Sequence, residues 1–162
     1  MKDTVLQILN DQIREELYSA YLYLAASAYC EQIPLPGFAH YLRVQSNEEV
    51  AHAMKIFEFI IDRGDRVVLQ PIEAPARDFG TPLQIAEKAL EHERHITGCI
   101  EKIYALAVKE GDYPTQVLMQ WFINEQVEEE KDAALLVDRL KMIGEHSGAI
   151  LTLDMVLARR GE

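Results

Sequence analysis

The sequence predicts an all-α fold: a four-helix bundle with one long crossover connection and a short fifth helix at the C-terminal end. Apolar residues recur every three or four positions along four long segments, which is the period of an amphipathic helix. Proline and glycine residues separate these segments. The chain has 162 residues, of which 49% are hydrophobic, so we expect one domain, residues 1–162, with a sizeable core.

The first expected helix runs from about Asp3 to Glu31 and ends before the proline- and glycine-containing segment 34–37. Its expected core face comprises Leu6, Leu9, Ile13, Leu17, Ala20 and Leu24. The second runs from about Phe38 to Arg63. Residues spaced alternately four and three apart share its inner face, so the polar members should be buried with the apolar ones. This set is Phe38, Leu42, Gln45, Glu49, His52, Ile56 and Phe59.

The third expected helix opens at Thr81 and Pro82, an N-cap followed by proline at the first helical position. Its expected inner face carries Leu83, Ala86, Leu90, Glu93, Thr97, Ile100 and Tyr104. The fourth runs from about Thr115 to Ile143. Its face carries Phe122, Glu125, Gln126, Glu129, Ala133, Leu136, Leu140 and Ile143. The short fifth helix is expected over about 149–160.

Connection lengths predict how these helices are arranged. Short connections make the first and second helices antiparallel neighbours, and likewise the third and fourth. The segment 65–80 is long enough to return along the bundle, because its extended length reaches about 53 Å and a helix of about 27 residues is about 40 Å long. The second and third helices can therefore run parallel.

Composition excludes several classes of function. The net charge of −11 argues against nucleic acid and against anionic membrane surfaces as partners. No apolar run approaches the roughly 20 residues needed to cross a bilayer, and the first residues lack the apolar stretch of a secretory signal. Cys30 and Cys99 have no CxxC spacing, so we expect reduced thiols in a cytoplasmic protein.

Each of the four long helices places a carboxylate on its own apolar face. The polar residues expected at the core are Glu16 on the first helix, Glu49 and His52 on the second, Glu93 on the third and Glu129 on the fourth. No lysine or arginine shares these faces. Burying one unpaired carboxylate costs several kcal/mol, and four together also repel one another.

Two arrangements relieve this cost. One is protonation of the carboxylates, which would make the chain a structural bundle. The other is a pair of divalent cations. Oxygen ligands with one imidazole suit iron or manganese, and no thiolate is placed to select zinc. A Glu-x-x-His pair aimed at a bundle interior is a known way to hold such metals, so we favour a two-metal centre.

Further acids lie beside this set. Glu48 precedes the second-helix carboxylate, and Glu125, Glu128 and Glu129 are spaced so that they share one face of the fourth helix. They form either a solvated acidic face or a further cation site. Tyr23 lies one heptad after the first-helix carboxylate. It is either a core ring, which its spacing favours, or a redox-active neighbour of the metals.

These residues closely resemble the non-haem ferritins of bacteria and archaea, over essentially the whole chain. The matching stretches are 16–19 with Tyr23, 48–52, 92–95 and 120–130. The resemblance implies a ferritin-like fold and a first iron site formed by Glu16, Glu49 and His52. It implies that Glu49 bridges to a second iron, whose site Glu93 and Glu129 complete.

The resemblance also implies neighbours for this di-iron centre. Gln126 matches a glutamine that lies beside the pair, and Tyr23 matches a tyrosine close to it. A third iron site is implied at Glu48, Glu125, Glu128 and Glu129.

Non-haem ferritins oxidise Fe²⁺ with O₂ or peroxide and store the ferric product as mineral inside a hollow shell of 24 subunits. The resemblance implies this ferroxidase and storage activity here. From the residues alone, a helical protein that buffers metal without redox turnover remains the alternative, and it predicts metal binding without O₂ consumption. A structural bundle with protonated carboxylates predicts no metal binding.

The sequence lacks motifs that are typical of two related families, the bacterioferritins and the rubrerythrins. Bacterioferritins carry a second Glu-x-x-His on the fourth helix, but the residue three after Glu129 is Asp132. They also bind haem through a methionine just after the bridging glutamate, where this chain has Val50, so no haem is expected. Rubrerythrins add a domain with paired CxxC motifs, which this sequence lacks.

Overall fold

The computed structural model describes residues 1–161, so Glu162, the last residue of the expected domain, lies outside them. The helices are α1 (Asp3–Gln32), α2 (Pro36–Asp62), α3 (Pro82–Glu110), α4 (Tyr113–Ile143) and α5 (Ser147–Leu157). Their bounds lie within about three residues of those expected, which is close to the usual uncertainty of a helix end. The expected all-α class is confirmed.

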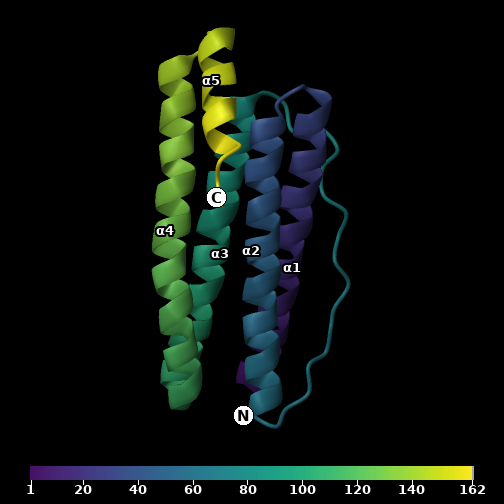
Figure 1. The fold of residues 1–162 in the computed structure, drawn as a ribbon. Helices are drawn as coiled ribbons and strands as arrows, with labels where there is room; N and C mark the ends of the chain where they lie inside the picture. The colour runs from purple at the N-terminus through teal and green to yellow at the C-terminus, as the bar shows by residue number, and fades with distance from the viewer. Residues whose placement is uncertain (162) are drawn as a thin grey trace.

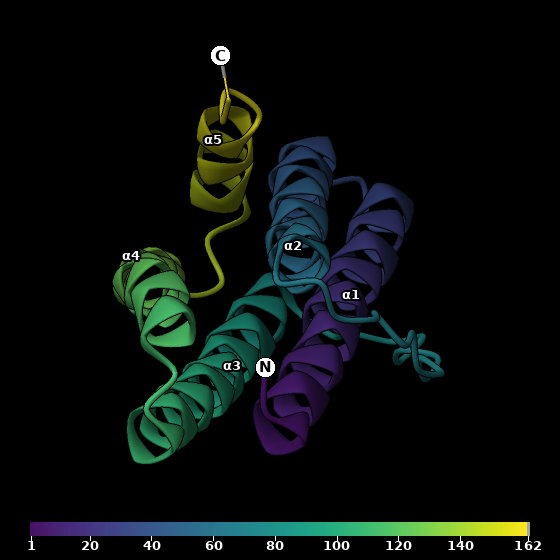
Figure 2. The same ribbon diagram turned by 90° about the horizontal axis from the view of Figure 1, so that it is seen from below.

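The four long helices form a bundle with the expected crossover (Figure 1). α1 packs along α2 and α3 packs along α4, each pair antiparallel, and α1 also contacts α3 (Figure 2). The connection between α2 and α3 runs the length of the bundle, so these two helices point the same way (Figure 1). α5 packs against α2 and α4 at one end of the bundle.

The crossover is fastened to α1 along its course. The Val68 amide donates to Asn10 Oδ1 at 2.7 Å, and the Tyr29 hydroxyl donates to the Gly80 carbonyl at 3.1 Å. Phe79 is buried in the core. These contacts satisfy backbone groups that helices would otherwise pair.

Local capping sets the ends of α3 and α4. The Thr81 hydroxyl accepts from the backbone amide of Gln84, and the Gln84 side-chain oxygen accepts from the backbone amide of Thr81. The two bonds form a complete capping box. Gly111 ends α3 in the left-handed region, with φ of 67°. Asp112 then caps α4 by accepting from the Thr115 amide at 3.2 Å, so α4 begins two residues earlier than the apolar pattern indicates.

α5 is seated on the start of α2 by a close backbone approach. Asp154 Oδ1 accepts from the Phe38 amide at 2.8 Å, so a residue of α5 caps α2 from a distance of 116 positions in the chain. A Cβ on Gly37 would lie 1.8 Å from the Asp154 carbonyl oxygen. Only glycine permits this approach.

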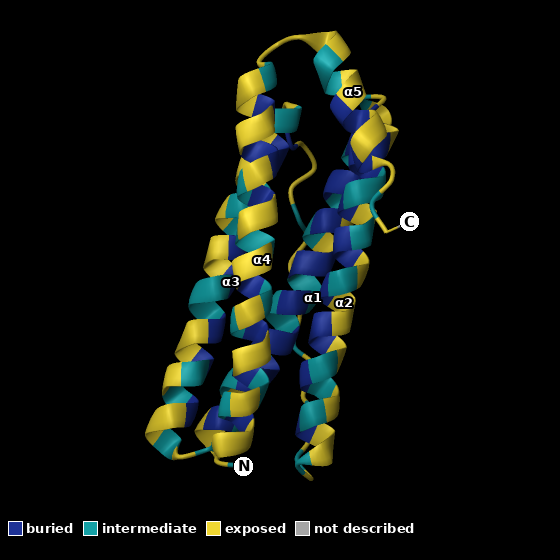
Figure 3. Ribbon diagram, turned by 60° about the vertical axis from the view of Figure 1, so that its left-hand side comes forward, coloured by how far each residue is buried: buried dark blue, intermediate teal, exposed yellow. Residues whose placement is uncertain are grey.

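Buried residues line the sides of the helices that face the inside of the bundle (Figure 3). The core consists of two apolar clusters with a polar layer between them. One cluster, next to α5, includes Tyr23, Cys30, Phe38, Leu42, Ile85 and Leu140. The other, at the opposite end, includes Leu9, Ile13, Ile56, Ile100, Met119 and Phe122. Buried polar residues between them include Glu16, Gln45, Glu49, His52, Glu93 and Gln126. The bundle therefore interrupts its own hydrophobic core at mid-height.

One expected core position is wrong. Leu24 is 48% exposed, whereas Tyr23 beside it is buried. Each residue advances about 100° around a helix, so Leu24 points roughly a quarter-turn away from the line that joins Glu16 and Tyr23. The inner face of α1 follows that line.

Both cysteines are free, as expected, with Cys30 buried and Cys99 half-buried. Among residues 1–161, no helix combines the length and apolarity that crossing a membrane requires.

Candidate metal centre

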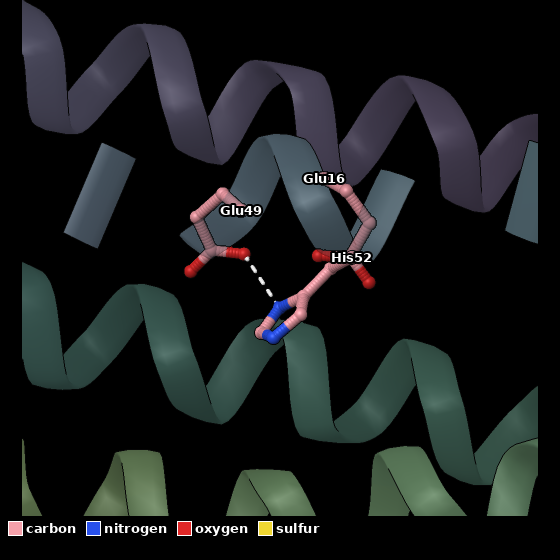
Figure 4. Close-up of side chains that lie close together, drawn as sticks. All are labelled: Glu16, Glu49 and His52. Atoms are coloured by element: carbon pink, nitrogen blue, oxygen red, sulfur yellow. Dashed lines mark hydrogen bonds and ion pairs between the residues drawn. The ribbon is translucent and has the colours of Figure 1, made fainter. Parts of the chain in front are cut away.

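The polar layer brings Glu16, Glu49 and His52 together from α1 and α2 (Figure 4). One donor atom from each lies within 4.8 Å of the others, and all three side chains are buried. His52 Nδ1 lies 3.2 Å from Glu49 Oε2. Gln12 donates to Glu16 Oε1 at 2.9 Å, but Glu16 Oε2 is buried and has no hydrogen-bond partner among the described residues.

Glu93 of α3 is held from two sides. The Tyr23 hydroxyl donates to Glu93 Oε1, and Gln126 Nε2 donates to Glu93 Oε2 at 3.2 Å. All three side chains are at most 4% exposed. Tyr23 and Gln126, which sequence placed beside the centre, therefore both contact the same carboxylate.

A second group of donors forms between α2 and α4. His52, Glu125 and Glu129 also offer donor atoms within 4.8 Å of one another. Gln45 Nε2 donates to Glu129 Oε2 at 2.6 Å. His52 thus belongs to both groups, and Glu125 and Glu129, two of the four acids implied for the third site, lie beside its imidazole.

The other two acids implied for the third site lie outside these donor groups. Glu48 is half-buried and accepts a hydrogen bond from Arg160 Nη2 at 2.8 Å. Glu128 is exposed. The described structure therefore gathers Glu125 and Glu129 but joins neither Glu48 nor Glu128 to them.

Burial governs the electrostatics of the centre. It is the first cause that raises the pKa of Glu16, Glu49, Glu93 and Glu129, and repulsion from a neighbouring carboxylate adds to it for each. For Glu129 the result is a pKa of about 7, raised by burial and then by Glu93. Burial, followed by the charge of Glu93, also raises the pKa of Tyr23 well above its usual value. These carboxyl groups are therefore easier to protonate than surface acids.

Aromatic rings close one side of the His52 imidazole. The Trp121 and Phe122 rings meet it edge to face, with centroids 5.5 and 5.9 Å away. Lys55 Nζ lies 4.2 Å from the Trp121 centroid. Such packing restricts the imidazole to few orientations.

Sequence reasoning missed three contributors. Gln12 orients Glu16, Gln45 orients Glu129, and Arg160 contacts Gln45. Gln45 was expected on the inner face but without a role. For Gln12, the available signal was its position one turn before a core glutamate. Arg160 carried no such signal, because its contacts depend on how α5 docks.

These donor groups are suited to binding divalent cations. An unpartnered buried carboxylate oxygen is costly, and Glu16 Oε2 is one. One Glu16 oxygen also lies within 4.8 Å of donor atoms of Glu49 and His52. Oxygen donors with one imidazole match iron or manganese. Cations would supply the positive charge that the clustered acids lack.

Comparison with known proteins agrees with this reading. Residues 6–143 match the family of ferritin-like domains. The chain is 38% identical to a bacterial non-heme ferritin of Bacteroides fragilis over 152 residues, which covers 94% of each. It is 35% identical over 154 residues to a probable bacterial non-heme ferritin-like protein of Haemophilus influenzae, covering 95% of this chain and 93% of that protein.

The fold gives the same result. An open-pore ferritin from the hyperthermophilic archaeon Archaeoglobus fulgidus superposes with a TM-score of 0.98 and 42% identity over 99% of both chains. A protein described as a humanized archaeal ferritin superposes with a TM-score of 0.97 over 99% of this chain and 97% of its own. On this agreement of sequence and fold, the chain belongs to the ferritin family, among its non-haem bacterial and archaeal members.

Proposed function

We propose that this chain is an iron-storage ferritin that oxidises Fe²⁺ at a di-iron centre inside each subunit. The observation that carries the proposal is the buried group of Glu16, Glu49 and His52 beside Glu93 and Glu129. Four acids and one imidazole from four helices meet in a layer that splits the hydrophobic core. A layer of this kind is costly without cations, and Fe²⁺ fits its donors.

The first Fe²⁺ would be held by Glu16, Glu49 and His52. The second would share Glu49 and take Glu93 and Glu129 as its further ligands. Two metal ions that share a carboxylate lie about 4 Å apart. At that separation both can deliver an electron to one oxidant.

The oxidation balances for a pair of ions. Each Fe²⁺ gives up one electron, and two electrons with two protons convert O₂ to H₂O₂. Peroxide in turn accepts two electrons and two protons to give two waters. The chain's residues hold the ions and accept or release protons at the carboxylates. Tyr23 and Gln126 contribute by fixing the Glu93 carboxylate.

A third iron would bind beside the pair, where Glu125 and Glu129 lie near His52. Glu48 and Glu128 would complete this site by turning toward it. No haem is part of this proposal, because Val50 replaces the methionine that binds it in bacterioferritins.

Storage requires an enclosure, because one bundle offers only a single acidic wall. Closed symmetric homo-oligomers are the usual way to build one. The proposed shell has 24 subunits of 18.5 kDa each, or about 440 kDa. The Archaeoglobus relative is described as an open-pore ferritin, which supports a shell in this family. We place the protein in the cytoplasm, with Fe²⁺ and O₂ or H₂O₂ as its substrates.

Iron loading in air tests storage directly. Fe²⁺ is added in large excess over the three proposed sites per chain, and the mixture is separated by size-exclusion chromatography with iron and protein assayed in each fraction. We expect iron to elute with protein at a ratio far above three per chain. A ratio that saturates at or below three would replace storage by metal buffering.

A further inference from the structure

Arg160 follows the end of α5 and lies against α2, beside the proposed iron centre. Its Nη1 donates to Gln45 Oε1 at 2.6 Å, and its Nη2 donates to Glu48 Oε2 at 2.8 Å. The guanidinium carbon lies 4.4 Å from the centroid of the Tyr41 ring. The Arg160 carbonyl accepts from His40 Nε2 at 2.9 Å. One residue is therefore fixed to one face of α2 by four different contacts.

The contact with Gln45 determines what Gln45 presents to the centre. Because Arg160 occupies the amide oxygen, the NH₂ group of Gln45 faces Glu129, to which it donates at 2.6 Å. With the arginine removed, the Gln45 amide oxygen would lose this donor, and the side chain would be held through its NH₂ group alone. Arg160 is thus a positioning residue for Glu129, acting through Gln45.

The contact with Glu48 places a permanent positive charge on an acid implied for the third iron site. Arginine stays protonated throughout the physiological range. Its planar group bonds the two acceptors, Oε1 of Gln45 and Oε2 of Glu48, at once. A metal cation at Glu48 would compete for the same carboxylate and would be repelled by the guanidinium.

We propose that Arg160 is a resident cation of the third site: it neutralises Glu48 in the metal-free chain and gives way when Fe²⁺ binds there. The inference rests on the third iron site of the proposed function. Because the same residue fastens the end of α5 to α2, its release would loosen that end of the chain. Occupancy of the third site is thereby coupled to the docking of α5.

A purely mechanical role for Arg160 predicts something different. If Arg160 only fastens α5, its removal loosens the chain end with or without iron and leaves iron affinity unchanged. The two roles are separated by measuring Fe²⁺ affinity and amide exchange in the same variants.

Three variants of the full chain isolate the charge from the hydrogen bonds. Arg160→Gln removes both, and Arg160→Lys keeps the charge but cannot reproduce the two-pronged contact. Arg159→Gln is the matched control, since it removes one positive charge from the exposed neighbouring position. Each is titrated with Fe²⁺ under argon by calorimetry. Hydrogen exchange of the amides at 154–160 is followed at zero, two and three Fe²⁺ per chain.

In the parent and in Arg159→Gln, we expect exchange at 154–160 to accelerate only with the third Fe²⁺. In Arg160→Gln, exchange should be fast at the outset, and the third Fe²⁺ should bind on the order of tenfold more tightly, because a nearby like charge is gone. Arg160→Lys should show fast exchange with near-parent affinity. This pattern would support the inference.

Equal third-ion affinity in the parent and Arg160→Gln would overturn it, as would exchange at 154–160 that ignores the third Fe²⁺. A parent that binds two Fe²⁺ and no third also overturns it, while leaving the di-iron proposal standing. In this titration, the di-iron centre of the proposed function fails if the parent binds fewer than two Fe²⁺ per chain.

Discussion

Glu49 is the residue on which both proposed iron sites depend, because it is the expected bridge between them. Its side chain is 2% exposed. Burial, followed by the charges of Glu93 and Glu129, raises its pKa well above the usual value. Replacing it with alanine should lower the initial rate of Fe²⁺ oxidation by more than about 100-fold, since even outer partners of metal ligands cost about 10–100-fold. Stopped-flow absorbance measures this rate.

The same change should leave the metal-free fold intact. Removing one of several repelling acids relieves their mutual destabilisation, so the free energy of unfolding should hold or rise. Glu58→Ala, at an exposed acid on the same helix, is the control and should oxidise iron like the parent. Parent-like oxidation by Glu49→Ala would remove Glu49 from the bridging position.

The carboxyl groups also predict how stability depends on pH. The pKa of Glu129 rises from 4.5 to about 7 in the folded chain, so the folded state holds a proton that the unfolded state has released. This contribution is fully present below about pH 4.5 and is lost as pH rises through about 7. It is on the order of 3 kcal/mol for this one group. Glu16, Glu49 and Glu93 shift in the same direction.

The metal-free chain should therefore melt at lower temperature at pH 8 than at pH 5. Fe²⁺ needs deprotonated carboxylates, so the gain in melting temperature on adding Fe²⁺ under argon should grow over the same interval. Calorimetric scans with chelator and with Fe²⁺ measure both. A gain in melting temperature that shrinks as pH rises would contradict the assignment of these acids as ligands.

At the level of single residues, the buried acids were predictable because each occupies a position on a helix face that is otherwise apolar. Glu16, Glu49 and Glu93 are at most 2% exposed, as expected. Arg160 could not be predicted, since its partners lie 112 and 115 positions away and no local pattern relates them. Which acids form the third site stays a prediction.

At the level of elements, the contact between α2 and α5 depends on Gly37. A Cβ there would lie 1.8 Å from the backbone oxygen of Asp154, so Gly37→Ala should push α5 off the start of α2. We expect a loss of about 1–3 kcal/mol in the free energy of unfolding and faster amide exchange in α5. Urea denaturation and exchange mass spectrometry measure the two effects.

Gly98→Ala is the matched control within α3. No heavy atom lies within 4 Å of a Cβ placed there, so alanine should stabilise the helix by roughly 0.5–1 kcal/mol. Equal effects of the two substitutions would show that the close approach at Gly37 is not what seats α5.

The number, order and direction of the helices were predictable. They follow from the spacing of apolar residues, from the proline and glycine residues that separate the helices, and from the lengths of the connections. The connection 65–80 is long enough to span the bundle, and the structure uses it that way (Figure 1). Leu24 was misplaced because its apolar character suits either a core or a surface position. The capping of α2 by Asp154 was also unpredictable, because the donor and acceptor meet only after α5 docks.

At the level of the whole molecule, charge should control assembly. A net charge of −11 per chain opposes the close packing of many copies, and 0.1 M salt largely screens that repulsion between charges more than about 10 Å apart. We expect the shell of about 440 kDa to loosen at low salt and to form at higher salt or with iron bound. Light scattering across a salt series measures this. A species that stays at one or two subunits throughout would rule out storage in a shell.

The central claim is that the polar layer holds two Fe²⁺ per chain and passes their electrons to an oxidant. Titration with Fe²⁺ under argon, followed by a pulse of O₂ in an electrode cell, tests it most directly. We expect at least two Fe²⁺ to bind per chain. The pulse should be consumed at about one O₂ per two Fe²⁺ in the first phase, the ratio that two-electron reduction of O₂ to H₂O₂ requires. In His52→Ala the number bound should fall by about one, because one site uses the imidazole. Binding without O₂ consumption, or no binding at all, would contradict the account.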